Sequence, residues 1–199
     1  QIEHNDSLFP NPIVRGNFQW KGGVKDTEVI FNPDHQGRWY VCWMPERESR
    51  SVMREERGKK VPPNTHMGCG GVDSYDLDAT VDSRGSKGAC HIYNKFNMSG
   101  ASNMFVAEYA SRPPMAKIFY EDVLMAAVFY GYPLLIENNK YGIVRYFESR
   151  GYDGYVMERP EHLRSYGNTV KTKGIPSNSQ DVIQAHASAI EDYIHNHVG

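Results

Sequence analysis

The sequence lacks several features that would place it at once in a class of protein. It has no signal peptide and no apolar run long enough to cross a membrane, so we expect a soluble, intracellular protein that does not contact a membrane. It has no Gly-x-x-x-x-Gly-Lys-Ser/Thr loop, which excludes that kind of nucleotide site. It also has no internal repeat or low-complexity segment, which excludes a repeat architecture.

Cysteine is scarce. The three cysteines, Cys42, Cys69 and Cys90, are an odd number at wide spacing, and two of them lie in apolar runs typical of strands. This pattern fits neither a disulfide framework nor a cysteine-based metal site. We therefore expect buried free thiols in a reducing compartment. Cys69 and Cys90 have no obvious base beside them in the sequence, so we do not expect them to act as nucleophiles.

Charge of one sign is not in excess either. Lysine and arginine total 22, aspartate and glutamate total 24, and the net charge is −2. This balance does not indicate nucleic-acid binding, although a local basic face is compatible with it. The 199 residues, 40% of them hydrophobic, suffice for one domain with a core. Because the chain starts with Gln and ends on an uncapped helical pattern, we expect a piece of a longer polypeptide; proteolytic maturation explains the missing Met equally well.

The first 64 residues differ from the rest. Two β-type runs, residues 30–31 and 39–43, flank a turn-rich segment and predict a β-hairpin. Residues 45–60 are rich in charge and predict a solvated loop, which Pro62 and Pro63 follow. We therefore place a boundary near Asn64, between an N-terminal linker and β-hairpin extension (1–64) and the main domain (65–199).

Strands and helices alternate in the main domain. Apolar runs predict three strands, ending at Asp73 and covering 89–93 and 104–109, then a helix over 120–130 that Gly131 caps. The later elements are a strand at 134–136, a helix at 141–150, a strand at 155–157 and an amphipathic helix at 179–197. This order predicts an α/β fold with a mixed sheet, its first three strands antiparallel and its later strands parallel, flanked by helices.

Two carboxylates stand where apolar strands end. Asp73 closes the run 67–72, and Glu137 closes the run 133–136. A carboxylate at the end of a buried strand is unfavourable unless something pairs with it. Metal ions often pair with two such groups, and α/β folds place their sites at strand ends. Asp73 and Glu137 are therefore the candidate catalytic residues, whereas we expect His91, inside an apolar strand, to be a core or sheet-face histidine.

The predicted order of elements resembles that of the ribonuclease H-like nucleases: an Asp-terminated strand, two antiparallel strands, a helix and an acid-terminated strand. The chain is more specifically similar to the nuclease domain of the large terminase subunit of tailed bacteriophages, over residues 66–199. The similarity rests on the short segments 86–89, 106–109, 121–123, 137–142 and 150–152. Residues 1–65 would resemble the stretch between that subunit's ATPase domain and its nuclease domain.

The resemblance implies metal-dependent hydrolysis of DNA phosphodiester bonds. Two divalent ions, Mg²⁺ or Mn²⁺, about 3.5–4 Å apart, would clamp the phosphate. By position, Asp73 would bridge the two ions and Glu137 would hold one. A further acidic ligand is expected in the turn after the first strand, where Asp82 is assigned and Asp76 and Asp78 compete with it.

The family also needs a third carboxylate, usually an aspartate near the start of a late helix. Asp181 stands at such a place, but closer to Glu137 than the family has it, and stabilisation of the helix N-terminus explains it without function. We therefore expect this ligand beyond Gly199, so that the chain alone would be weak or inactive as a nuclease.

The DNA-binding candidates are basic residues near the predicted strand ends and in the segment 164–179: Lys87, Lys140, Arg164, Lys171 and Lys173. For each of them a solvated surface charge is the alternative. The partners implied by the resemblance are double-stranded DNA, the ATPase domain on the same polypeptide, the small terminase subunit and the portal protein. The implied location is the host cell cytoplasm, outside the mature particle.

Two alternatives stay open. Another ribonuclease H-like enzyme, such as a junction resolvase or a transposase, would share the two acids and act on a different DNA structure. A non-catalytic DNA-binding or adaptor domain would carry Asp73 and Glu137 as structural residues.

Overall fold

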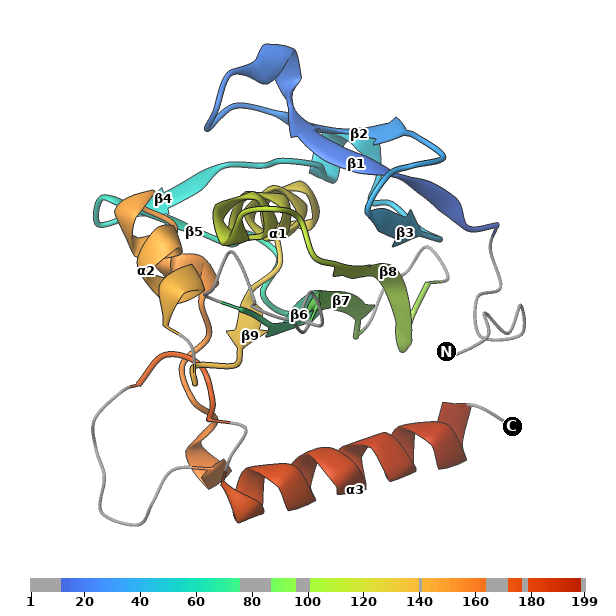
Figure 1. Cartoon of the computed structure of the whole chain (residues 1–199), viewed down its shortest axis with the longest axis vertical. Coiled ribbons are helices and arrows are strands. Elements are labelled where there is room, and N and C mark those ends of the chain that lie inside the picture. The colour runs from blue at the N-terminus through green and yellow to red at the C-terminus, as the bar shows by residue number, and fades with distance from the viewer. Residues whose placement is uncertain are drawn as a thin grey trace.

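The computed structural model describes residues 12–75, 87–95, 101–139, 141–163, 172–176 and 179–197. Within these residues, seven strands form one mixed sheet in the order β2-β1-β3-β8-β7-β6-β9 (Figure 1). The strands are β1 (Val14–Trp20), β2 (Val29–Pro33), β3 (Trp39–Val41), β6 (Gly68–Asp73), β7 (Gly88–Asn94), β8 (Met104–Ser111) and β9 (Leu134–Ile136). Two further strands, β4 (Arg54–Glu56) and β5 (Lys59–Val61), form a separate antiparallel ribbon.

The strand directions in the main domain match the prediction. β6, β7 and β8 are consecutive and antiparallel, and β9 returns beside β6 in the parallel direction. The α/β class and the mixed sheet are therefore confirmed. The strand predicted at 155–157 shortens to a single parallel bridge between Val156 and Leu134, because a 3₁₀ turn, Asp153–Tyr155, occupies its first part.

The hairpin predicted within residues 30–43 is wrong. Its two runs became β2 and β3, and both pair with β1 instead of with each other. β1 was not predicted because its apolar residues are interrupted by polar ones, yet the alternation buries Phe18 and Trp20 on one side. β3 also pairs with β8, so the strands on either side of residue 64 share one sheet.

Helix α1 (Ala116–Tyr130) occupies the centre of the molecule. Twelve of its fifteen residues are buried, so it is apolar nearly all round rather than amphipathic. It begins four residues before the predicted start and ends as predicted at Gly131, whose φ of 69° lets its N–H donate to the Ala127 carbonyl at 2.8 Å. The strands β1 and β2 and the helix α2 (Gly142–Ser149) pack against it.

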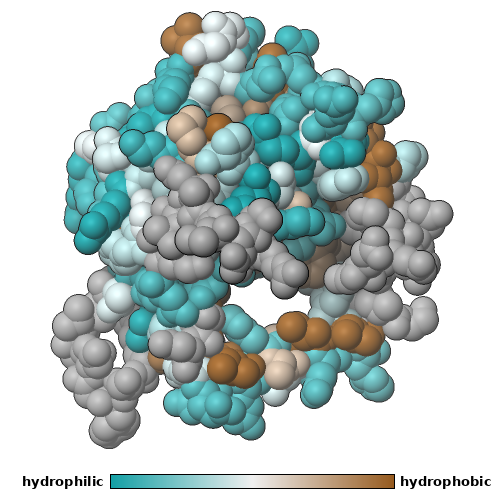
Figure 2. Space-filling view, in the orientation of Figure 1, coloured by the Kyte–Doolittle hydropathy of each residue, from teal (hydrophilic) through white to brown (hydrophobic). Residues whose placement is uncertain are grey.

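Helix α3 (Gln180–His197) lies across the other side of the sheet from α1 (Figure 1). The Tyr193 ring meets Tyr93 and Phe105 at centroid distances of 6.0 and 5.4 Å, and Val182 is buried. The three isoleucines of the helix are exposed: Ile183, Ile190 and Ile194. Brown patches lie along this part of the molecule in Figure 2. Among the described residues, no helix is both long enough and apolar enough to span a membrane.

Candidate functional site

The structure brings Asp73 and Glu137 to the same edge of the sheet. Val72 in β6 is the register partner of Ile136 in β9, and the Glu137 N–H donates to the Val72 carbonyl at 2.9 Å. Because the two strands are parallel, the two carboxylates follow their partners as neighbours. Val72 and Ile136 are buried in the core, so alternation turns both acids to the opposite face, the one away from α1. Asp73 is exposed and Glu137 is half-buried.

Local hydrogen bonds hold the Glu137 end of the site. The Asn139 side-chain amide donates to Glu137 Oε1 at 2.8 Å, and the Asn138 side-chain amide donates to the Lys173 carbonyl at 2.9 Å. Residues 172–176 extend the sheet at this point, through a parallel bridge between Glu137 and Ile175. Gly174 is required here, because its φ is +70° and a Cβ would lie 2.4 Å from the Ile136 carbonyl oxygen.

The described basic candidates differ in their surroundings. Lys87 is exposed and directly precedes β7, at the edge where β6 ends. It makes no ion pair among the described residues. Lys173 lies two positions before Ile175, but its ammonium donates to the Asp153 carbonyl and lies 3.4 Å from the Asp153 carboxylate. Lys173 would therefore have to leave Asp153 to contact DNA.

The other predicted residues cannot be placed at this edge. Asp82, its competitors Asp76 and Asp78, and the basic candidates Lys140, Arg164 and Lys171 lie outside the described residues. Asp181 is exposed in the first turn of α3, as expected for a carboxylate that stabilises a helix N-terminus.

The donor chemistry at the edge fits part of a magnesium or manganese site. Carboxylate oxygens are hard ligands, which these ions prefer. Within the described part of the chain, no three His, Cys, Asp or Glu side chains are grouped so that they could hold a metal ion. Asp73 and Glu137 would thus supply two of the ligands, and others would have to come from water, from substrate or from residues outside the described ranges.

The cysteines take no part in this edge. All three are free, as predicted, with Cys42 and Cys90 buried and Cys69 half-buried. Burial raises the pKa of Cys42 to about 11 and also raises the pKa values of Cys69 and Cys90. Burial therefore favours the protonated thiol at all three positions, which disfavours a nucleophilic role.

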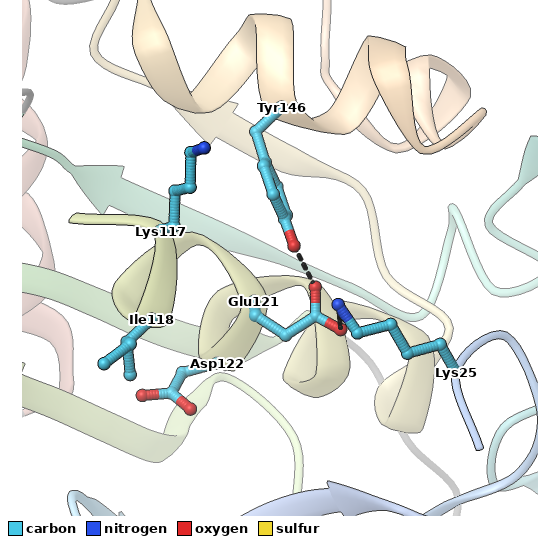
Figure 3. Close-up of a pocket in the computed structure, with 6 residues that line it drawn as sticks. All are labelled: Lys25, Lys117, Ile118, Glu121, Asp122 and Tyr146. Carbon is cyan, nitrogen blue, oxygen red and sulfur yellow. Dashed lines mark hydrogen bonds and ion pairs between the residues drawn. The ribbon is translucent and has the colours of Figure 1, made fainter. Parts of the chain in front are cut away.

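A second pair of carboxylates lies on the opposite side of the sheet. An open hollow of about 400 Å³ is lined by Lys25, Lys117, Ile118, Glu121, Asp122 and Tyr146 (Figure 3). Glu121 accepts hydrogen bonds from Trp20 Nε1 at 2.7 Å, from Arg150 Nη1 at 2.5 Å and from the Tyr146 hydroxyl. Side chains of the protein itself therefore pair with the Glu121 carboxylate.

Asp122 is paired as completely. Arg38 donates to its two carboxylate oxygens at 2.7 and 3.0 Å, and the Tyr109 hydroxyl donates at 3.1 Å. Burial raises the pKa of Asp122, while the bonds from Arg38 and Tyr109 oppose that rise. The two carboxylates tie the N-terminal strands to α1 and α2, and we interpret this hollow as structural. Sequence reasoning did not find these contacts, because their partners lie far apart in the chain.

Comparison with known proteins found no match: no family model, no curated protein and no solved structure matches the chain.

Proposed function

We propose that this chain is the ribonuclease H-like nuclease domain of a large terminase subunit, which cuts concatemeric viral DNA during genome packaging. The observation that carries the proposal is the placement of Asp73 and Glu137 at neighbouring ends of parallel strands, on an accessible face. The strand order β8-β7-β6-β9, with three antiparallel strands and then a parallel one after a helix, supports it, since ribonuclease H-like nucleases share this order of elements.

The residues would divide the work by position. Asp73 and Glu137 would hold the divalent ions, with Asp82 as a further ligand. When bound, such ions activate water and stabilise the leaving oxygen of the phosphodiester. The Asn139 amide, which donates to Glu137 Oε1, would orient this carboxylate. Lys87, at the same edge, would bind a DNA phosphate without reading sequence.

The remaining parts of the proposal come from the resemblance. Lys140, Arg164, Lys171 and Lys173 would extend the phosphate contacts. The ATPase domain of the same polypeptide, the small terminase subunit and the portal would deliver double-stranded DNA in the host cell cytoplasm. A third carboxylate, which the resemblance also implies, would complete the metal site.

The test is cleavage of linear, supercoiled and four-way-junction DNA with Mn²⁺, Mg²⁺ or EDTA. We expect weak nicking of linear and supercoiled DNA, because the third carboxylate is not among the assigned residues, and this nicking should need the metal and be lost in Asp73→Asn and in Glu137→Gln. Glu191→Gln, an exposed carboxylate on α3, is the matched control and should behave as the wild type. A strong preference for junctions would favour a resolvase instead.

Metal binding is measured separately by calorimetry with Mn²⁺. The proposed function expects binding by the wild type and weaker binding by the two acid variants. If the substitutions change neither Mn²⁺ binding nor DNA cleavage, the two acids are structural and the chain is a binding or adaptor domain.

A further inference from the structure

The three glycines of β6 differ in how much space surrounds them. A Cβ on Gly68 would lie 2.2 Å from the Tyr132 ring, and a Cβ on Gly70 would lie 2.5 Å from Leu134. Both positions are therefore fixed by packing. A Cβ on Gly71 would meet no atom within 4 Å, and its backbone is not in the left-handed region. Neither packing nor backbone conformation thus requires glycine at position 71.

Glycine inside a strand weakens the strand and often marks a place where a ligand or another backbone approaches closely. Gly71 is exposed and lies two residues before Asp73, so alternation puts both on the same face. Its register partner in β7 is His91, and its partner in β9 is Leu135. Because Gly71 has no side chain, the surface is low at this position. This low surface lies between β9, which leads to Glu137, and the imidazole of His91.

His91 lies beside this low surface, opposite Gly71 in β6 on one side and Glu108 in β8 on the other. Asp73 pairs with Ala89, so His91 in β7 and Lys87, directly before β7, are its two diagonal neighbours, at about 7–8 Å. The His91 side chain is 46% exposed, its Nε2 lies 3.8 Å from Glu108 Oε1, and its ring meets the Phe105 ring edge-on at 5.9 Å. Two nitrogen-bearing side chains thus flank Asp73, one on each side along β7.

We propose that His91 is a DNA-contacting residue that positions the phosphate backbone beside the two acids, and that Gly71 keeps the approach between them open. Such a contact serves a nuclease because Asp73 and Glu137 repel a polyanion, and hydrogen-bond donors on either side offset that repulsion. The inference rests on the proposed nuclease function, and it adds a residue pair that the metal chemistry does not require.

The experiment measures duplex DNA binding by fluorescence anisotropy in EDTA, where no cleavage occurs. Gly71→Val fills the open space, and Gly71→Ala is its small control. His91→Phe keeps a ring against Phe105 without a donor, and His91→Asn restores an N–H donor. Lys25→Ala, on the opposite side of the sheet, controls for the loss of any one cation.

We expect Gly71→Val and His91→Phe to weaken DNA binding about fivefold or more, and Gly71→Ala, His91→Asn and Lys25→Ala to stay within about twofold of the wild type. Mn²⁺ affinity by calorimetry and Tm should not fall in any of these variants. Equal DNA binding by Gly71→Val and His91→Phe, with cleavage by the wild type intact, overturns the inference and leaves the proposed function standing. A loss of Mn²⁺ affinity parallel to the loss of DNA binding also overturns it, because the effect would then act through Asp73. A wild-type chain that binds no DNA overturns both.

Discussion

Two of the carboxylate pairs in the described residues lie in different surroundings. Glu121 and Asp122 lie beside α2 and the N-terminal strands, where Trp20, Arg38, Tyr109, Tyr146 and Arg150 use their oxygens. Asp73 and Glu137 lie at a strand edge on an accessible face, beside a glycine with empty space over it. Acidic residues are thus informative about function only together with what already pairs with them.

The largest expected effect concerns the edge pair. Asp73→Asn or Glu137→Gln should lower the weak metal-dependent DNA cleavage expected of this chain by about 100-fold, to background, because each removes a charge that would face the transition state. Without metal the same variants should keep or raise Tm, since each removes the repulsion between two neighbouring negative charges. Cleavage assays and thermal unfolding in EDTA check the two parts. A large loss of Tm would place this pair with the structural carboxylates.

Breaking the other pair should act on stability instead. Arg38→Met leaves Asp122 buried without its bidentate partner, and we expect a loss of about 3 kcal/mol in the free energy of unfolding. Urea unfolding measures this loss. Lys59→Met, which removes an exposed ion pair with Asp153, is the control and should produce no measurable change. If both variants are equally stable, the Arg38–Asp122 pair does not hold the N-terminal strands.

A smaller effect separates Gly71 from its neighbours in β6. Gly71→Ala should stabilise the protein by about 0.5 kcal/mol, because alanine loses less backbone entropy on folding and its Cβ meets no atom. Gly70→Ala should destabilise it, since the new Cβ would overlap Leu134. Opposite signs in urea unfolding would support open space over Gly71 and close packing at Gly70, whereas equal losses would contradict this difference.

The smallest expected effect is the pH dependence contributed by Asp26. Burial opposes its ionisation, but the cations Arg150 and Lys60, 2.8 and 3.3 Å from its Oδ1, outweigh burial and lower its pKa below 3.8. A lowered folded-state pKa stabilises the protein above the unfolded value, and that contribution is lost as pH falls from about 5 through 3.8 toward the folded pKa. Asp26→Asn should therefore flatten the fall in Tm between about pH 5 and pH 3. The positive φ of 64° at this position suits asparagine, which makes the variant a fair test. If Asp26→Asn leaves the fall in Tm at low pH unchanged, other carboxylates cause that fall.

Much of the central fold could be predicted because its signals are local. The apolar runs of β6 to β9 and the Gly131 cap are readable in the chain, and their order predicted that Asp73 and Glu137 close strands of one sheet. β1 was missed because Arg15, Asn17 and Gln19 interrupt its apolar positions. Only pairing with β2 and β3 makes this weak pattern a strand.

The structural carboxylates could not be recognised from sequence. Trp20 reaches Glu121 across 101 positions, and Arg38 reaches Asp122 across 84. No local pattern records such contacts, because they depend on how β1 and β3 lie over α1. The openness around Gly71 is equally non-local: Gly68, Gly70 and Gly71 look alike in the sequence and differ only in what the fold places above them.

The pairing of β3 with β8 has a consequence for how the chain can be divided. A fragment starting at residue 65 would leave β8 with a row of unpaired N–H and C=O groups along residues 107–109. Exposed strand edges of this kind recruit strands from other molecules and promote aggregation. The same cut would strip Asp122 of Arg38 and Glu121 of Trp20. The N-terminal strands thus cover the edge of β8. An expression fragment without them should precipitate even with Asp73 and Glu137 intact.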